Sequence, residues 1–293
     1  MAADHGVAGR GVSAYPSVVT GQMVDNFLAG GAAISVLARL HDAGIVVVDL
    51  GTAIAPEPRP GLLSRRIGAG TNDFSREPAM TRAEAVRAIE VGIEIAGTLA
   101  DDGCRLVIPG DMGIGNSTAA AALVATLLGV PAAEVTGRGT GLGDDAYQAK
   151  IALVDAAIEL HHPDPADPVG VLAALGGFEI AGLAGLVLGA AARRIAVLLD
   201  GFIVGAAALV AVRMDPLVDA YCLAGHRSAE PGHRRVLETL GLRPLLDLDL
   251  RLGEGSGAAV ALGVVDAAVR LHAEMATFAE ASVDDREPRT GSH

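Results

Sequence analysis

The stretch RLVIPGDMGIGNSTAAAALVATLL, residues 105–128, predicts one complete strand–loop–helix unit. Its first part, 105–108, is a short apolar run of the kind that forms a buried strand. A glycine-rich loop at 110–118 follows directly, and the alanine-rich run 117–128 has the composition of a helix. Because a strand followed by a loop and a helix is the building unit of α/β folds, this stretch indicates the fold class of the chain.

The same alternation continues on both sides of this unit. Apolar runs at 45–48 and 195–199 predict two further strands. Thr81 and Glu84 have the spacing of a capping box, which predicts a helix from Thr81 to Ala100. Further helices are expected at 146–160, 179–193, 202–213 and 256–281. Strands that alternate with helices predict an α/β fold whose mostly parallel sheet is covered by helices on both faces.

Size and composition indicate a folded chain. With 293 residues, 51% of them hydrophobic and 19% charged, the chain can bury a large core, and disorder is excluded as its main state. Residues 1–281 are predicted to form a single α/β domain. Residues 282–293 are charged and rich in turn formers, and they are predicted to be a disordered tail.

The charge balance excludes one class of partner. Asp and Glu outnumber Lys and Arg by 35 to 22, a net charge of −13, and Lys150 is the only lysine. An acidic chain without a basic run lacks the charge pattern of a nucleic-acid-binding protein. Cys104 and Cys222 form neither a disulfide framework nor a CxxC motif, so a reducing, cytoplasmic setting is expected. We find no signal peptide, and no apolar run reaches the roughly 18 residues of a membrane span.

The glycine-rich loop at 110–118 is the first candidate site. Glycines allow backbone N–H groups to turn toward an anion at the start of a helix. The loop is not a Walker A motif, and it is not the dinucleotide motif GxGxxG, because Thr118 stands in place of the third glycine. A tight turn capped by Ser117 would need the same residues, so phosphate binding and a purely structural turn are both open.

A second glycine-rich loop, GRGTGL at 137–142, precedes Lys150 on the next predicted helix. Alternating glycines suit a backbone that lies against a ligand, and a lysine supplies a compact positive charge to a phosphate. The alternative is that Lys150 lies on an exposed helix face and is surrounded by solvent.

The third candidate is Glu254, which lies between glycines in LGEGSG at 252–257. Ligands of open α/β sheets bind at the carboxyl ends of the strands, where a glutamate can act as a general base. A negative charge near the start of the last helix would also interact favourably with the helix dipole, so a structural role is open as well. The histidine-containing segments at 4–6 and 226–233 lack metal-binding spacing, so no metal site is expected.

Taken together, these segments resemble the nicotinate-nucleotide–dimethylbenzimidazole phosphoribosyltransferase family. The matching segments are DHGVAGRGVSAYPSVVTGQMV, GGAAI, EPAMTRAEA, GDMGIGNSTAAAAL, GRGTGLGDD, GGFEIAGLAGL, LLDGFIVGAAALVA, GHRSAEPGH and PLLDLDLRLGEGSGAA. Each glycine motif alone is unspecific, but the ordered set covers nearly the whole chain. The resemblance implies a homodimer with a Rossmann-like α/β core and a smaller helical part.

The resemblance also implies a reaction and a set of site residues. The 5-phosphoribosyl group would pass from nicotinate mononucleotide to dimethylbenzimidazole, giving alpha-ribazole phosphate and nicotinate in the assembly of the cobalamin nucleotide loop. Glu254 matches the catalytic base. The residues implied to bind phosphate and ribose are Asp111, Gly113, Gly115, Asn116, Ser117 and Lys150. Those implied to bind the acceptor base are Ser13, Tyr15, Gln22 and Met23. Because no diphosphate leaves, neither a metal nor another cofactor is implied.

The sequence departs from the family pattern in three places. Asp111 stands where the family usually has Glu, and Gly143 stands where the first Asp of a GLDD-like run is expected. The chain also begins at the DHG segment, whereas family members carry an N-terminal helical stretch before it. These departures leave open an inactive nucleotide-binding paralogue. A second alternative is a hydrolase that carries out the same chemistry with water as the acceptor.

Overall fold

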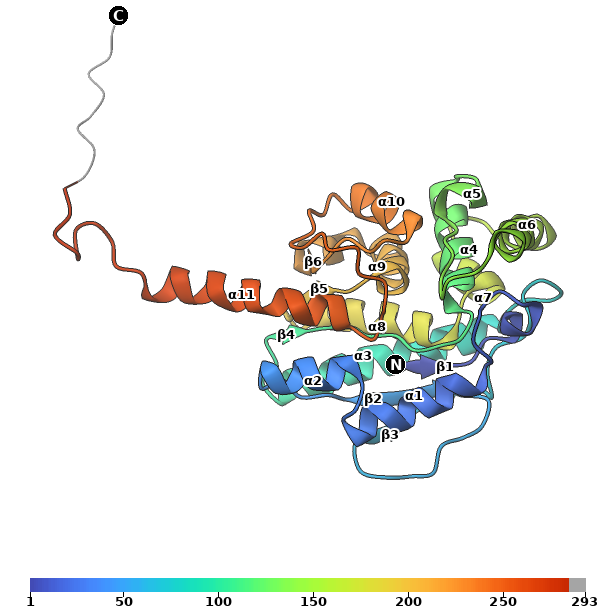
Figure 1. The fold of residues 1–293 in the computed structure, drawn as a ribbon, viewed down its shortest axis with the longest axis horizontal. Coiled ribbons are helices and arrows are strands. Elements are labelled where there is room, and N and C mark those ends of the chain that lie inside the picture. Colours follow the sequence, from blue (N-terminus) through green and yellow to red (C-terminus); the bar gives the residue numbers. More distant parts are fainter. Residues whose placement is uncertain (285–293) are drawn as a thin grey trace, which may run out of the picture.

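The computed structural model describes residues 1–284, which form six strands, eleven α-helices and two 3₁₀ helices (Figure 1). The strands are β1 (Ala2–Ala3), β2 (Val47–Gly51), β3 (Leu62–Ser64), β4 (Leu106–Val107), β5 (Ala196–Leu199) and β6 (Cys222–Ala224). The α-helices are α1 (Val18–Ala29), α2 (Ala33–Leu40), α3 (Arg82–Asp101), α4 (Asn116–Leu128), α5 (Ala132–Val135), α6 (Asp144–His161), α7 (Pro168–Leu175), α8 (Phe178–Ala192), α9 (Phe202–Met214), α10 (Pro231–Thr239) and α11 (Ser256–Glu274). The 3₁₀ helices are η1 (Gly6–Arg10) and η2 (Pro216–Tyr221).

The strands form two three-stranded sheets, β1-β2-β3 and β4-β5-β6, and every pairing within them is parallel. An isolated parallel bridge between Ala2 of β1 and Met112, just beyond β4, joins the two sheets. The backbone N–H of Ala3 donates to the Met112 carbonyl over 3.0 Å. Across this bridge the strand order is 3-2-1-4-5-6, the order of a Rossmann fold. The predicted α/β class with parallel pairing is confirmed.

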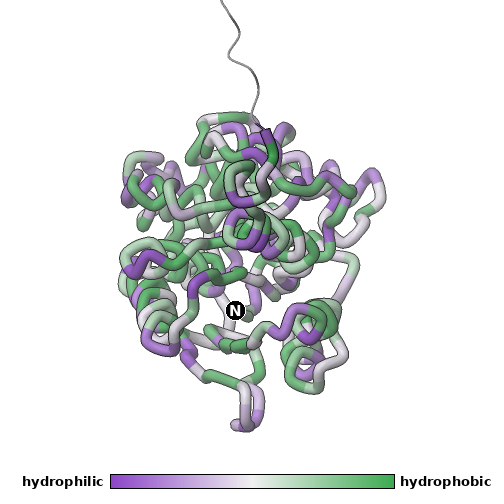
Figure 2. Tube along the Cα trace, turned by 90° about the vertical axis from the view of Figure 1, so that its left-hand side faces the viewer, coloured by the Kyte–Doolittle hydropathy of each residue, from purple (hydrophilic) through white to green (hydrophobic). Residues whose placement is uncertain are grey.

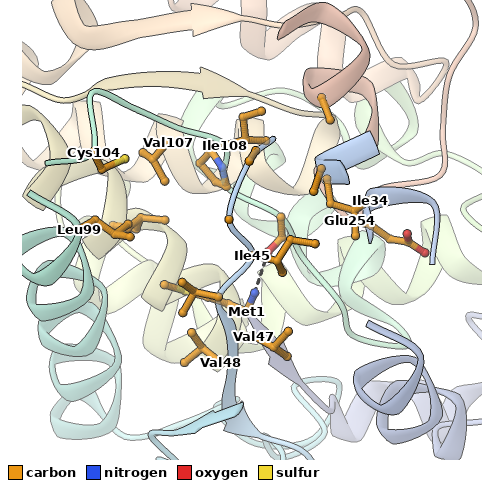
Figure 3. Close-up of a pocket in the computed structure, with 18 of the residues that line it drawn as sticks. Met1, Ile34, Ile45, Val47, Val48, Leu99, Cys104, Val107, Ile108 and Glu254 are labelled. Atoms are coloured by element: carbon orange, nitrogen blue, oxygen red, sulfur yellow. Dashed lines mark hydrogen bonds between the residues drawn. The ribbon is translucent and has the colours of Figure 1, made fainter. Parts of the chain in front are cut away.

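An apolar cavity of about 550 Å³ separates β2 from β4 on the amino-terminal side of this bridge. Val47 and Val48 line one side, and Val107 and Ile108 line the other (Figure 3). The Met1 amino group lies between them and donates to the Gly110 carbonyl over 2.8 Å. Both overall views place the N-terminal residue well inside the outline of the molecule (Figures 1 and 2).

Helix α3 begins where its sequence predicts. Thr81 Oγ1 accepts from the Glu84 backbone N–H over 3.2 Å, and the Thr81 N–H donates to Glu84 Oε2 over 2.8 Å. This reciprocal pair is a capping box, which satisfies two N–H groups that the helix leaves free. The capping-box prediction is confirmed.

Helices α3 and α8 approach each other so closely that glycine is required at their crossing. A Cβ at Gly92 of α3 would collide with the Gly182 carbonyl of α8, and one at Gly185 of α8 would collide with the Ile89 carbonyl. Backbone therefore packs directly on backbone in the centre of the molecule. This contact fixes α8 beneath the sheet, and with it Glu179 in its first turn.

The predicted helix at 256–281 is too long, because α11 ends at Glu274. A second cap explains the ending: the Thr277 backbone N–H donates to Glu280 Oε2 over 2.8 Å, and the Glu280 N–H donates to Thr277 Oγ1 over 3.3 Å. This local pairing competes with continuation of the helix. The predicted disordered tail, 282–293, lies outside the described residues from 285 onward.

By length and composition alone, two helical stretches could span a membrane. The sequence predicted no such stretch. They are Val18–Leu40 and Ser256–Glu274. The first consists of two separate helices, α1 and α2, because Gly30 ends α1 in a left-handed conformation with φ 78°. Core helices pass the same criterion, so the finding is weak evidence for a span.

The α3–α8 crossing gives a test of the fold. Gly92→Ala should lower the free energy of unfolding by about 1–3 kcal/mol, because the added methyl group must push the two helices apart. Urea unfolding followed by circular dichroism measures the change. Gly97→Ala is the matched control in the same helix, since its Cβ would meet only Arg193 Nη2 at 3.6 Å, an ordinary contact. Equal stability of the two variants would contradict the close packing.

Candidate active site

Three loops meet at the carboxyl ends of β4 and β5. The loop after β4 passes under the loop before α11, where a Cβ at Gly110 would lie 2.5 Å from the Glu254 carbonyl. Asp200, directly after β5, accepts from the backbone N–H groups of Gly255 and Ala258 at 3.2 and 2.9 Å. These contacts bring residues 110–117, 200 and 254 into one site, as expected for ligand sites of parallel sheets.

An anion site, defined here as Gly113, Gly115, Asn116, Ser117 and Lys150, forms at the start of α4. Gly115 is left-handed, with φ 97°, which turns the loop into the first turn of the helix. Lys150 Nζ, from α6, donates to Ser117 Oγ over 2.9 Å and to the Gly137 carbonyl over 3.1 Å. An ammonium group, a hydroxyl and the amino end of a helix therefore converge, which is the chemistry that binds phosphate.

Lys150 is buried, with 1% of its surface exposed, so the alternative of an exposed, solvated lysine is wrong. Burial lowers the pKa of Lys150 to about 8, while the negative charge of Glu230 opposes that shift. The Glu230 carboxylate itself accepts from the Gly139 N–H over 3.1 Å. Lys150 thus contacts both glycine-rich loops, through Ser117 of the first and Gly137 of the second.

Asp111 is a buried carboxylate beside the anion site. Burial raises its pKa to about 7, the negative charge of Asp200 adds to the rise, and a 2.9 Å hydrogen bond from Asn116 Nδ2 opposes it. Asp111 also lies close to the loop that carries Glu254, because a Cβ at Gly253 would be 3.6 Å from Asp111 Oδ2. The carboxylate therefore lies between the anion site and Glu254.

Glu254 does not cap α11, since the N-cap residue is Gly255. The side chain is half-buried, and burial and the negative charge of Asp200 raise its pKa, while a hydrogen bond from the Ile34 backbone lowers it. Glu254 lies next to Ile34 at one end of the cavity, and Leu99 lies at the other end (Figure 3). A carboxylate with raised proton affinity in a partly apolar setting suits a general base.

Only part of the predicted acceptor-base group reaches these loops. Ser13 Oγ lies 3.3 Å from Thr140 Oγ1, at the tip of the second glycine-rich loop. Tyr15 and Gln22 are exposed, and Met23 is half-buried on α1. Within residues 1–284, none of these three side chains hydrogen-bonds to Glu254 or to the anion site.

The sequence did not single out His5 and Glu179 as site residues. Both are fully buried and lie 2.6 Å apart, and a Cβ at Gly113 would be 3.0 Å from Glu179 Oε1. Burial opposes charge on His5, but the Glu179 carboxylate, together with the negative charges of Asp4 and Asp111, outweighs burial and raises the histidine pKa. No local pattern links the two residues, because they are 174 positions apart in the sequence. The geometry as a whole is that of an α/β enzyme with an anion site next to a buried carboxylate.

Comparison with known proteins agrees with this class. A family model described as phosphoribosyltransferase matches residues 1–283. The nicotinate-nucleotide–dimethylbenzimidazole phosphoribosyltransferase of Chloroflexus aggregans is 56% identical over 286 residues, covering 98% of this chain and 81% of the relative. The protein of the same name from Geobacter sulfurreducens is 53% identical, covering 97% and 80%. The crystal structure of CobT from Thermus thermophilus aligns with a TM-score of 0.93 at 50% identity, covering 97% of this chain and 84% of that one. The chain belongs to this phosphoribosyltransferase family.

Asp111 gives a test of the electrostatics of the site. Its pKa in the folded protein, about 7, lies above the ordinary value of 3.8. The folded state therefore loses stability as pH rises from about 4 to about 7, because the carboxylate becomes charged in the interior. Asp111→Asn should remove this loss. The free energy of unfolding of the variant, relative to that of the unmodified protein, should therefore be about 2–3 kcal/mol higher at pH 8 than at pH 5.

Chemical unfolding at the two pH values measures this difference. The exposed carboxylate Asp145 provides the control, since Asp145→Asn should change stability by the same small amount at both values. A pH-independent effect of Asp111→Asn would contradict a buried, titrating carboxylate.

Proposed function

We propose that this chain transfers the 5-phosphoribosyl group of nicotinate mononucleotide to dimethylbenzimidazole, giving alpha-ribazole phosphate and nicotinate. The observation that carries the proposal is Glu254 placed next to an anion site that contains a buried lysine. Relatives that bear the name of this reaction are more than 50% identical over nearly the whole chain. The reaction belongs to the assembly of the nucleotide loop of cobalamin.

The anion site binds the donor. Lys150 and Ser117 hold the 5-phosphate, and the first turn of α4 contributes N–H groups and a favourable dipole. The bond from the anomeric carbon to the pyridinium nitrogen breaks, and its electron pair goes to that nitrogen. Because the ring is positively charged before cleavage, its nitrogen is neutral in the departing nicotinate and needs no proton. The transition state carries oxocarbenium character at the anomeric carbon.

Glu254 activates the acceptor. One ring nitrogen of dimethylbenzimidazole forms the new bond to the anomeric carbon, and the N–H proton of the other passes to the Glu254 carboxylate. The raised pKa of Glu254 makes it a better proton acceptor at neutral pH than an exposed glutamate. Proton transfer of this kind supplies about 10²–10⁴-fold of rate, and fixed positioning of the two substrates supplies much of the remainder.

The remaining proposed contacts follow from position. Asp111 and Asn116 lie between the phosphate end and Glu254, where they contact the ribose. Ser13 lies against the second glycine-rich loop, and Tyr15, Gln22 and Met23 follow it as the acceptor-base segment. Thr20, in the same segment, accepts from the Ile114 N–H over 3.1 Å, which ties α1 to the anion loop. This tie supports a shared site for the two substrates.

The assembly proposed for this enzyme is a homodimer in the cytoplasm, with residues 1–281 as one domain. One buried core cluster extends from Ala3 to Leu240, which supports a single domain. Helix α11 projects from the body of the molecule (Figure 1), and Val260, Val264 and Leu271, which share one face of it, are exposed. A second copy would cover this apolar face. The two free cysteines, Cys104 and Cys222, support a reducing compartment.

Turnover of the two substrates tests the proposed function. Incubation with nicotinate mononucleotide and dimethylbenzimidazole should release nicotinate only when both are present, measured by chromatography. Glu254→Gln should lower the turnover number about 10²–10⁴-fold, because the amide cannot take the proton. Glu274→Gln, at the exposed end of α11, is the matched control. Turnover of Glu254→Gln at the unmodified rate would contradict the base assignment, and release without acceptor would identify a hydrolase.

Lys150 separates donor binding from acceptor binding. Lys150→Arg should raise the Michaelis constant for nicotinate mononucleotide several-fold more than that for dimethylbenzimidazole, because a planar guanidinium cannot replace a compact ammonium group in this buried position. Steady-state kinetics with each substrate varied in turn gives both constants. An unchanged donor constant would place the phosphate away from Lys150.

A further inference from the structure

The loop that carries Glu254 is held in an unfavourable backbone conformation. Gly253, Glu254 and Gly255 all have positive φ, at 83°, 66° and 85°. Glycine adopts this region freely, but a glutamate does so only at a cost in conformational energy. Three successive left-handed residues would relax to another conformation unless neighbouring groups hold them. The groups that hold this loop therefore determine where the Glu254 carboxylate lies.

Asp200 makes two of the polar contacts that hold it. The fully buried carboxylate accepts from the Gly255 N–H through Oδ2 and from the Ala258 N–H through Oδ1, so it binds the loop and the first turn of α11 at once. His226 Nε2 lies 3.4 Å from Asp200 Oδ1. The imidazole ring also lies directly against Gly257, because a Cβ at that glycine would collide with it.

We propose that Asp200, supported by His226, is a positioning residue that holds Glu254 in place for proton removal from the acceptor base. The inference rests on the proposed function, in which Glu254 takes that proton. Asp200 sits at the carboxyl end of β5 and His226 just beyond β6, so two neighbouring strands of the sheet fix the loop. The contact partners are backbone groups, which explains how a carboxylate can position a base without touching substrate.

Asp200 also influences the pKa of Glu254 through its negative charge. The groups that face the Glu254 loop are Asp111 from the β4 loop, Asp200 from β5, His226 from the β6 loop and the Ile34 N–H from α2. Burial is the main cause of the raised pKa of Glu254, and the negative charge of Asp200 adds to it because it favours the protonated form. Removal of that charge must lower this pKa, so the acidic limb of the pH–rate profile should move to lower pH.

Two variants perturb the loop by different routes. Asp200→Asn keeps the side-chain size but removes the charge and one acceptor, so the loop is released. Gly257→Ala leaves every polar group in place and displaces the start of α11 by pushing against the His226 ring. Gly263→Ala is the matched control in the same helix, since its Cβ would meet only His41 Cε1 at 3.5 Å.

Both loop variants should lower kcat about 10–100-fold, because a displacement of about 1 Å costs that much in rate, while the Michaelis constant for nicotinate mononucleotide stays within about twofold. Asp200→Asn alone should move the acidic limb of the kcat profile to lower pH. Gly263→Ala should behave as the unmodified enzyme. Unchanged kcat in both loop variants, or an acidic limb that does not move in Asp200→Asn, would overturn the inference.

Hydrogen exchange followed by mass spectrometry gives a readout that does not depend on turnover. Residues 250–262 should exchange at least about tenfold faster in Asp200→Asn, while the α4 and α6 segments of the anion site keep their protection. Equal exchange in the two proteins would show that Asp200 does not hold the loop. If the unmodified protein released no nicotinate, the proposed function would fail, yet this exchange measurement would still decide whether Asp200 fixes residues 253–258.

Discussion

The parallel pairing of the strands is the constraint on which the rest of the molecule depends. Because all pairings within the two sheets run in one direction, the segments that leave β1, β4, β5 and β6 emerge at the same edge. Asp4 and His5 follow β1, residues 110–117 follow β4, Asp200 follows β5 and His226 follows β6. The bridge at Met112 brings the two sets of strand ends together. The site is therefore a consequence of topology, with β1, β4, β5 and β6 each contributing one loop.

Gathering these loops concentrates acidic groups in the interior, which is unfavourable for stability. Asp111 and Glu254 respond with raised pKa values, and Asp200 contributes to both shifts. Other carboxylates find partners instead: Glu179 pairs with His5, and Asp200 accepts backbone N–H groups at the start of α11. Functional sites commonly retain such unfavourable features where the chemistry requires them. Here burial, together with the negative charge of Asp200, raises the pKa of Glu254, as its proposed role as a base requires.

The sequence predicted the features that depend on neighbouring residues and missed those that depend on distant ones. The capping box at Thr81 and the apolar runs of β4 and β5 are local patterns, and the structure bears them out. Strands β1, β3 and β6 lie outside the apolar runs that predicted the other three strands, so they were not predicted. Lys150 could be matched to the glycine-rich loops by resemblance, but its burial could not be read from α6, whose neighbouring residues are largely exposed. The His5–Glu179 pair depends on the α3–α8 packing and on residues 174 positions apart, so only the structure could reveal it.

The central spatial claim of the proposed function is that the donor phosphate binds at Lys150 while the acceptor base presents its N–H to Glu254. A crystal structure of the Glu254→Gln variant with nicotinate mononucleotide and dimethylbenzimidazole tests it most directly, because the variant should leave both substrates intact. We expect the phosphate within hydrogen-bond distance of Lys150 Nζ and the acceptor ring nitrogen against the side chain at position 254. A phosphate bound away from Lys150, or a base whose N–H faces solvent, would contradict the account.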